Sequence, residues 1–326
     1  MSPTNSPRIV LADLVAEYPS VALEALAASG IPFVDAEAAG GDPMDWIREA
    51  EVLVVTWYRV TEEVIAQLTR CKVIIRIGVG YDNIDAEAAR RRGIAVCNVP
   101  DYCMGEVADH AMAMALAQAR ALPFLDRCVR EGTWKPTLPH PMPALEVMQF
   151  GVLGYGRIGR ATLTRARGFG FRLLACDPYL PETAFPLDVR RCTLEELLAE
   201  ADILSVHVPL TAETHHLLNA ERLAQMKPTA ILINTARGAV LETPALVAAL
   251  QGGRLAAAGI DAFEEEPLPL DHPLLSCPNA LLAPHYAWHS RESKPRLFLM
   301  AVEEALRAAR DEPLRSCVNG VQPNRV

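Results

Sequence analysis

The chain has 326 residues, of which 51% are hydrophobic and 22% charged, a composition typical of a globular protein long enough for two domains. Its net charge of −9 argues against non-specific binding to nucleic acid or to an anionic membrane, since both require a basic patch. The eight cysteines form no CxxC pair, and we find neither an apolar leader nor a run of transmembrane length. We therefore expect a cytoplasmic protein with reduced thiols and with neither a nucleic-acid nor a membrane partner.

The first hundred residues alternate short apolar runs with helix-like segments. Gly30 closes the first helix, and Thr61 followed by two acids is a typical helix start. Such alternation predicts a parallel sheet with helices on its faces. Strands are expected at 8–14, 31–35, 52–56, 72–80 and 94–100, and helices at 21–30, 61–68 and 85–93.

The middle of the chain begins with an Ala- and Met-rich stretch at 105–122, which has too few polar positions for a solvated helix and predicts a buried one between the domains. The proline-rich segment 133–147 predicts a loop. Six strand-like runs follow between residues 149 and 284, and a helix-like segment at 291–312 ends the pattern. The predicted fold class is α/β, with two Rossmann-like or flavodoxin-like doubly wound parallel-sheet domains.

Residues 154–159 match the GxGxxG pattern, follow a strand-like run and open an amphipathic helix. Gly154 permits a tight turn, Gly156 lets a pyrophosphate approach the backbone, and Gly159 lets the helix pack on the strand. Asp177 ends the next strand, 18 residues beyond Gly159, where a carboxylate accepts hydrogen bonds from ribose hydroxyls. Because a 2′-phosphate would meet that carboxylate, we expect NAD rather than NADP. The alternative is a Rossmann-like domain that binds no nucleotide.

Four further segments occur in a fixed order along the chain. They read RIGVGYDNID at 76–85, NTARG at 234–238, DAFEEEP at 261–267 and APH at 283–285. With the dinucleotide pattern, they make nearly the whole chain similar to the D-isomer-specific 2-hydroxyacid dehydrogenase family. The resemblance implies an NAD-dependent enzyme that interconverts a 2-oxo acid and a D-2-hydroxy acid.

Within that family the sequence most resembles the C-terminal binding protein branch, which includes transcriptional corepressors as well as enzymes. The likeness rests on Arg76, on Trp288 three residues after His285, and on the SCVN ending at 316–319. The sequence departs from the corepressors at 286–289, where they carry small residues after the histidine, and it stops at Val326 without their long tail. Both departures favour an enzyme over the alternative, an NAD(H)-sensing interaction module with little turnover. A dehydrogenase of substrates other than simple 2-hydroxy acids stays a third possibility.

The resemblance also implies a discontinuous domain order with a cleft between the domains. Residues 1–103 and 290–326 would form the substrate-binding domain, and residues 104–289 the NAD-binding Rossmann domain. A homodimer, formed through the Ala-rich helix and the proline-rich loop, is implied as well.

Reduction of a 2-oxo acid requires that the carboxylate be held and that a proton be delivered as hydride arrives. The resemblance assigns the first task to Arg237, whose planar fork suits a carboxylate, and the second to His285. Glu266 would orient and tune that histidine. The alternatives are a surface arginine in a turn, a core histidine with satisfied hydrogen bonds, and a solvated acidic run at 264–266.

Substrate contacts are expected from Arg76, from the backbone N–H groups of Val79 and Gly80, and from Trp288. Arg76 is equally well explained as a surface or helix-dipole partner, and Trp288 as core packing. Trp57 and Tyr58 follow a buried strand, and with Tyr286 and Trp288 they suggest room for a hydrophobic or thioether side chain rather than a phosphate. Further cofactor contacts are expected at Tyr155, Arg157, Ile158, Val208, Pro209, Thr214, Thr235, Ala236, Asp261 and His285.

The remaining histidines carry less information. His215 and His216 are adjacent and are expected to point in different directions, and His140 lies in the proline-rich loop. No HxH or HxxxH pair with acids completes a metal site, so we expect no metal.

Overall fold

The computed structural model describes residues 8–322, which form two compact units. Of the described residues, the first comprises 8–103 with 289–322, and the second comprises Met104–Trp288. The expectations of no leader at the N-terminus and of an ending at Val326 concern residues 1–7 and 323–326, which lie outside the described residues. No helix among the described residues is both long and apolar enough to cross a membrane.

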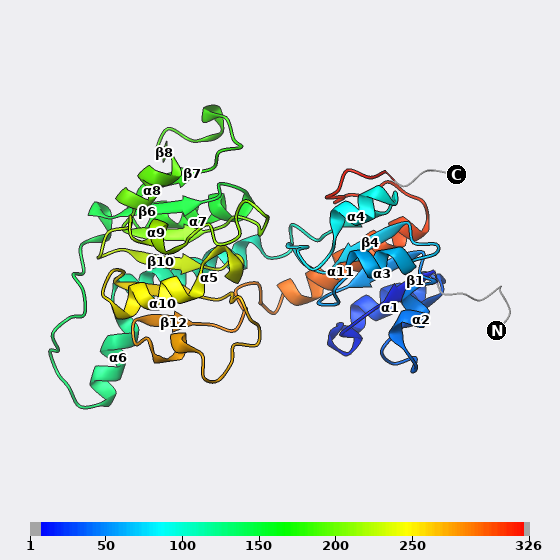
Figure 1. Cartoon of the computed structure of the whole chain (residues 1–326), viewed down its shortest axis with the longest axis horizontal. Coiled ribbons are helices and arrows are strands. Elements are labelled where there is room, and N and C mark those ends of the chain that lie inside the picture. The colour runs from blue at the N-terminus through cyan, green and yellow to red at the C-terminus, as the bar shows by residue number, and fades with distance from the viewer. Residues whose placement is uncertain (1–7, 323–326) are drawn as a thin grey trace. The chain divides into compact units, whose positions relative to one another are not determined.

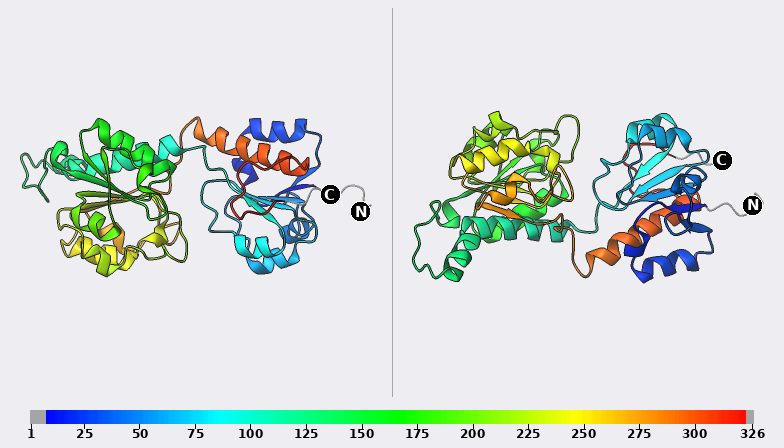
Figure 2. Two further views of the ribbon diagram at one scale, coloured as in Figure 1. Left: turned by 90° about the horizontal axis from the view of Figure 1, so that it is seen from above. Right: turned by 60° about the horizontal axis from the view of Figure 1, so that its bottom comes forward.

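The first unit is a five-stranded parallel sheet in the order β2-β1-β3-β4-β5, with helices on both faces (Figures 1 and 2). Its strands are β1 (Ile9–Leu11), β2 (Phe33–Asp35), β3 (Val52–Val55), β4 (Val73–Arg76) and β5 (Ala95–Cys97). Helices α1 and α11 pack together on one face, and α3 and α4 lie together on the other. The helices are α1 (Ser20–Ala28), α2 (Pro43–Ile47), α3 (Glu62–Gln67), α4 (Ala86–Arg91) and α11 (Ser293–Ala309), with a 3-10 turn η1 (Val15–Glu17).

Local sequence accounts for these elements. The three central strands β1, β3 and β4 are buried at every position, as expected for parallel strands covered on both faces. The Thr61 side chain accepts a hydrogen bond from Val64 N and caps α3, as the sequence predicts. Gly30 follows α1 with a φ of 69°, a conformation that glycine adopts at little cost.

The second unit is a seven-stranded parallel sheet in the order β12-β11-β10-β9-β6-β7-β8. Helices α5 and α7 pack on one face, and α8, α9 and α10 cover the other (Figure 2). Its strands are β6 (Gln149–Leu153), β7 (Arg172–Cys176), β8 (Val189–Arg191), β9 (Ile203–Val206), β10 (Ile231–Asn234), β11 (Ala257–Ile260) and β12 (Ala280–Leu282). Its helices are α5 (Met104–Ala119), α6 (Leu122–Arg130), α7 (Arg157–Gly168), α8 (Leu194–Glu200), α9 (Ala220–Leu223) and α10 (Thr243–Gln251), with 3-10 turns η2 (Leu145–Val147), η3 (Glu182–Ala184), η4 (Gly238–Val240) and η5 (Pro273–Ser276). Two parallel-sheet α/β domains are therefore confirmed.

Two details of the second unit differ from the prediction. The sequence predicts six strands here and misses β8, because this edge strand has three residues and two of them are exposed arginines. The predicted helix over 105–122 ends at Ala119, and α6 begins at Leu122. Ala121 between them has a left-handed φ of 49°, and a proline occupies the first turn of α6, as is common at helix starts.

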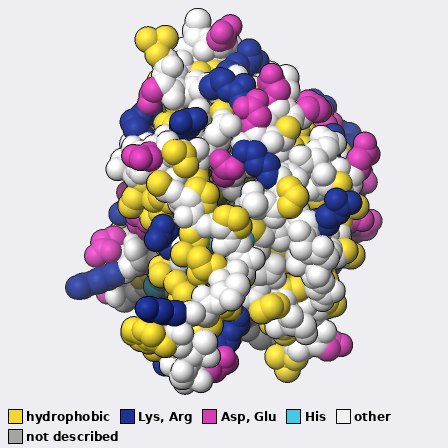
Figure 3. All heavy atoms as spheres, turned by 90° about the vertical axis from the view of Figure 1, so that its left-hand side faces the viewer, with side chains coloured by type: hydrophobic (Ala, Val, Ile, Leu, Met, Phe, Trp, Pro, Cys, Tyr) yellow, Lys and Arg dark blue, Asp and Glu magenta, His cyan; other side chains and the backbone are white. Residues whose placement is uncertain are grey.

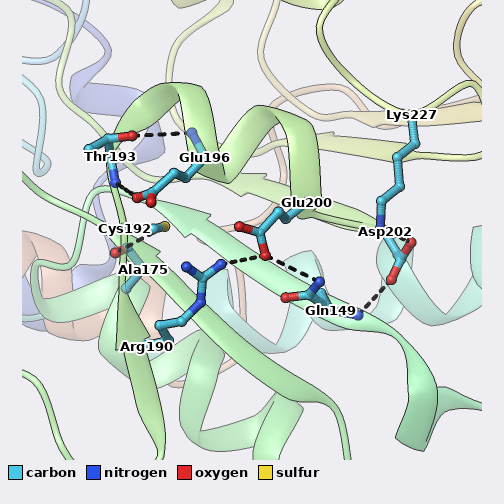
Figure 4. A network of polar contacts seen from close by, with 9 residues as sticks. All are labelled: Gln149, Ala175, Arg190, Cys192, Thr193, Glu196, Glu200, Asp202 and Lys227. Atoms are coloured by element: carbon cyan, nitrogen blue, oxygen red, sulfur yellow. Dashed lines mark hydrogen bonds and ion pairs between the residues drawn. The ribbon is translucent and has the colours of Figure 1, made fainter.

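The amino-terminal edge of this sheet is held by a network of polar contacts (Figure 4). Asp202 Oδ2 accepts a hydrogen bond from Gln149 N at 2.7 Å, and Lys227 Nζ lies 2.7 Å from Asp202 Oδ1. At the opposite end of the sheet, after β8, the Thr193 side chain and Glu196 form a reciprocal capping box that starts α8. The candidate functional residues described below also lie at the carboxyl-terminal ends of the strands.

Candidate active site

The turn after β6 is shaped by close backbone approaches. Gly154 has a φ of 93°, and a Cβ there would lie 2.7 Å from the carbonyl oxygen of His207. A Cβ on Gly159 would lie 2.1 Å from the carbonyl oxygen of Gly154. Both positions therefore require glycine, for the turn and for helix packing respectively. A Cβ on Gly156, in contrast, would meet no atom within 4 Å, which leaves the backbone open to a ligand.

Helix α7 starts directly after Gly156, which offers no side chain to cap it. The first N–H groups, on Arg157 and Ile158, thus lie at an uncapped helix N-terminus, where the helix dipole favours an anion. Tyr155 is buried, and its ring stacks on Phe185 at a centroid distance of 4.8 Å. The turn therefore combines an open backbone with an electropositive helix end, as a pyrophosphate requires.

Asp177 follows β7, and its carboxylate is fixed by the backbone. Oδ2 accepts a hydrogen bond from Tyr155 N at 3.0 Å, and Oδ1 accepts one from Tyr179 N at 3.1 Å. The carboxylate is thus anchored beside the glycine turn at the edge where a ribose would lie. After β10, at the same edge of the sheet, Thr235 Oγ1 is buried and has no hydrogen-bond partner among the described residues. An orphaned hydroxyl of this kind fits a site that is completed by a polar ligand.

The other predicted cofactor contacts lie on neighbouring turns at the carboxyl ends of strands. Val208 and Pro209 follow β9, and Thr214 Oγ1 donates to Pro209 O at 2.6 Å to close that turn. Ala236 follows β10, and its N–H donates to Asn234 Oδ1 at 3.0 Å. The residues of the second unit therefore fit an NAD molecule, which would span this edge of the sheet.

His285 and Glu266 form a close pair. The Nδ1 atom of His285 lies 2.8 Å from Glu266 Oε2, and Glu266 Oε1 accepts a hydrogen bond from Phe263 N at 2.8 Å. Burial raises the pKa of Glu266, but the hydrogen bond and charge of His285, the Phe263 N–H and the charge of Arg237 together bring it below its usual value. Glu266 is therefore an ionised partner that occupies one ring nitrogen of His285.

Arg237 approaches this pair from a second loop. Gly238 lies against the backbone of Phe263, because a Cβ on Gly238 would lie only 1.8 Å from the Phe263 carbonyl carbon. This contact brings the turn after β10 beside the loop that carries Glu266. The Arg237 guanidinium donates to Ala236 O at 2.9 Å, and its charge is one cause of the lowered pKa of Glu266. The structure thus brings Arg237, Glu266 and His285 together within one unit.

The first unit contributes a separate set of predicted residues. Arg76 ends β4 and is 8% exposed, with Nη1 donating to Ile77 O at 2.8 Å. Its guanidinium lies over the Trp57 ring, 5.3 Å from the centroid, in a cation–π arrangement. Gly78 has a φ of 140°, and a Cβ there would overlap Arg76 Nη1 at 1.5 Å. Val79 and Gly80, which follow, are half-buried.

Trp288 and Tyr286 follow the catalytic candidate His285 in the second unit. Their ring centroids are 6.4 Å apart and tilted by 50°. Tyr286 is exposed and Trp288 is half-buried, so Trp288 is not a residue of the closed core.

Sequence reasoning missed Asp13 in the first unit. Its buried carboxylate accepts hydrogen bonds from three successive backbone N–H groups, on Thr56, Trp57 and Tyr58, at 2.6 to 2.8 Å. It therefore fixes the turn that presents Trp57 beside Arg76. The only signal in the sequence is a charged residue directly after a strand.

His207 was also missed. It follows β9, and burial lowers its pKa to about 3, so the ring is neutral at physiological pH. Its Nε2 lies 2.9 Å from Ser205 Oγ. The backbone of His207 closes the glycine turn through its contact with Gly154.

The expectation for the paired histidines is wrong. The rings of His215 and His216 are 4.0 Å apart and tilted by only 30°, because His216 adopts a left-handed φ of 48°. His216 Nε2 lies 3.1 Å from Glu264 Oε2, and the N–H of Thr243 donates to Glu264 Oε1 at 2.6 Å. Glu264 therefore holds the start of α10 and is not a merely solvated member of the acidic run.

Residues 112–287 match the model of the D-isomer specific 2-hydroxyacid dehydrogenase NAD-binding domain. The chain is 44% identical over 262 residues to the glyoxylate reductase of Korarchaeum cryptofilum, covering 79% of each protein. Two solved structures match at a TM-score of 0.84 with 30% identity. One is the D-lactate dehydrogenase of Aquifex aeolicus with NAD and lactic acid, covering 93% of this chain and 95% of that one. The other is the NADPH-dependent glyoxylate/hydroxypyruvate reductase of Sinorhizobium meliloti with NADP and malonate, covering 98% and 99%.

The chain therefore belongs to the D-isomer specific 2-hydroxyacid dehydrogenase family of NAD-binding oxidoreductases. The family and fold predicted from the sequence are confirmed. The particular likeness to the C-terminal binding protein branch stays a prediction.

Proposed function

We propose that this protein reduces small 2-oxo acids to D-2-hydroxy acids with NADH, and that His285 is the acid–base group of the reaction. The observation that carries the proposal is the His285–Glu266 pair, with Nδ1 and Oε2 2.8 Å apart. A carboxylate on Nδ1 fixes the tautomer and leaves Nε2 as the atom that exchanges a proton with the substrate oxygen. Several relatives are named as glyoxylate reductases, which favours an enzyme over the alternative of an NAD(H)-sensing interaction module with little turnover.

The roles of the individual residues follow from their chemistry. Bound NADH would supply the hydride. Arg237 would hold the substrate carboxylate through its planar guanidinium and stabilise the negative charge that develops on the carbonyl oxygen. Nε2 of His285 would then donate its proton to that oxygen, while Glu266 stabilises the imidazolium beforehand. Arg76, the N–H groups of Val79 and Gly80, and Trp288 are proposed as further substrate contacts.

Glyoxylate and hydroxypyruvate are the first substrates to test, because several relatives carry these names. The decisive experiment is oxidation of NADH by the purified protein with a panel of 2-oxo acids of increasing side-chain size. The panel includes a branched aliphatic and a thioether 2-oxo acid, because the exposed Trp57 and Tyr286 leave the side-chain preference open. Absence of turnover with every member would contradict the proposal.

Asp177 is proposed to set the choice of cofactor. The fixed carboxylate would repel a 2′-phosphate, so replacing Asp177 with Ala should narrow the preference for NADH over NADPH by about tenfold, equivalent to about 1.4 kcal/mol. The measurement is the ratio of kcat/KM for the two cofactors with one 2-oxo acid. A wild-type protein that uses both equally well would remove Asp177 from the ribose site.

Arg237 is proposed to act in both binding and turnover. Arg237→Lys keeps the charge and loses the fork, so we expect kcat to fall and KM for the 2-oxo acid to rise, with kcat/KM reduced about tenfold or more. Steady-state kinetics at saturating NADH measures both. Unchanged constants would show that the guanidinium does not contact the substrate.

A homodimer through the Ala-rich helix α5 and the proline-rich loop 133–147, with α6 between them, is proposed as well. Large hydrophobic side chains are exposed along this segment, and Figure 3 shows hydrophobic side chains beside Lys and Arg on the face that carries it. They are Leu122, Val129, Trp134, Leu138 and Val147, of which Trp134 is 79% exposed. A cytoplasmic location stays a prediction.

A further inference from the structure

Asp261 directly follows β11 and is only 1% exposed. Its Oδ1 accepts a hydrogen bond from Tyr286 N at 2.8 Å, and Oδ2 accepts one from Ala287 N at 3.0 Å. Its backbone carbonyl accepts a third from His285 N at 2.7 Å. One buried residue thus holds three successive N–H groups that begin at the proposed acid–base histidine.

That backbone needs to be held. His285 has a φ of 55°, in the left-handed region that a histidine enters only at an energetic cost. Such a conformation persists where surrounding contacts determine it, and the three hydrogen bonds to Asp261 do so here. The backbone of His285 sets where its side chain starts, so Asp261 contributes to the position of the imidazole together with the Glu266 contact on Nδ1.

A second residue lies against the carboxylate. His110 on α5 places Nε2 3.6 Å from Asp261 Oδ1, and this nitrogen is buried without a hydrogen bond among the described residues. Residues spaced along α5 contact successive residues of β11. Gln118 donates to Ala258 O at 2.7 Å, and Met114 contacts Gly259, where a Cβ would lie 3.0 Å from the Met114 Cβ.

His110, Met114 and Gln118 are spaced by four residues, so they lie on one face of α5. This face follows β11 from residue 258 to Asp261. The packing of α5 on β11 therefore places the His110 ring beside the Asp261 carboxylate.

We propose that His110 is a positioning residue that orients the Asp261 carboxylate and, through it, the backbone of His285. Nε2 of His110 lies 3.6 Å from Oδ1, and an N–H there would attract this oxygen while both carboxylate oxygens stay directed at the N–H groups of Tyr286 and Ala287. His110 does not touch the reacting atoms. The inference rests on the proposed function of His285 and adds a helix residue that acts on it from the other side of the loop. In this proposal Asp261 holds the backbone of residues 285–287 in addition to its expected cofactor contact.

The test compares variants at position 110. His110→Phe keeps the ring volume and removes the donor, so kcat should fall about tenfold or more, because a small misplacement of a reacting group is costly. His110→Gln restores an N–H near the position of Nε2 and should recover most of that loss. The pH at which kcat/KM for reduction falls should stay as in the wild type, because the Glu266 pair is not altered.

Asp109→Asn is the matched control on α5. It removes the ion pair with Arg165 and leaves Asp261 untouched, so kcat should stay unchanged. A wild-type kcat in His110→Phe would overturn this inference and leave the proposed function of His285 standing. So would a loss that Gln does not recover or that appears equally in Asp109→Asn. Full activity in His285→Ala would instead overturn the proposed function and this inference with it. Thermal unfolding of each variant identifies any that fails to fold, and Asp261→Asn then repeats the kcat and pH measurements, with the same expectations, on the carboxylate side.

Discussion

Replacing His285 with Ala should reduce kcat/KM for 2-oxo acid reduction by about 10²–10⁴-fold, the range typical of a positioned acid or base. The imidazole is held by Glu266 on Nδ1, so Nε2 is the group that has no substitute when the ring is removed. The loss should appear in kcat rather than in KM, because proton transfer occurs in the transition state and not on substrate binding. Steady-state kinetics in both directions measures it.

Two controls separate a chemical role from a structural one. The midpoint of thermal unfolding should change little in His285→Ala, since the ring is partly exposed at the edge of the sheet. His140→Ala, in an exposed loop where Nδ1 lies 2.9 Å from Pro141 O, should keep wild-type rates. A His285→Ala protein with more than about a tenth of the wild-type rate would be too active for the proposed acid–base role.

The fold was predictable because its signals are local. Buried parallel strands produce continuous apolar runs such as 52–55 and 73–76, and helix starts are marked by capping residues such as Thr61. The glycine turn was predictable from the GxGxxG pattern, although only Gly159 is required by a local contact, with Gly154, whereas Gly154 is required by a contact with His207 after β9. Strand β8 was missed because its stabilisation comes from pairing with β7, not from apolar residues of its own.

Residues of the candidate site were predictable only where they belong to a recognisable sequence motif. Arg237, Glu266 and His285 stand in three segments whose proximity the sequence does not state, and the resemblance supplied the connection. The residues that hold them were not predictable. Asp13 and Asp261 act through backbone N–H groups that lie 43 and 25 positions along the chain from them, so no local pattern marks either role. The contact of His110 with Asp261 likewise depends on how α5 docks on β11.

Glu266→Gln should move the pH profile rather than simply lower the rate. The carboxylate of Glu266 lies 2.8 Å from Nδ1 of His285, and the charge of His285 is one of the causes that bring the pKa of Glu266 below its usual value. Gln keeps a hydrogen-bonding side chain of similar size and removes the negative charge. The attraction between the two charges is therefore lost in the variant.

The pH profile should move to lower pH for both reduction and oxidation. Reduction requires the protonated ring, so the alkaline limb of kcat/KM for the 2-oxo acid should move to lower pH, with a loss of rate on the alkaline side. Oxidation of the hydroxy acid requires the neutral ring, so its activity should appear at lower pH by the same amount. If Glu266 served only to hold the loop through Phe263 N, Glu266→Gln would change the midpoint of thermal unfolding. The pH limbs of reduction and of oxidation would then both stay in place. Profiles that coincide with the wild type in both directions would therefore contradict the pairing, whatever the loss in rate, whereas a parallel shift of the two limbs is the result that a carboxylate on Nδ1 requires.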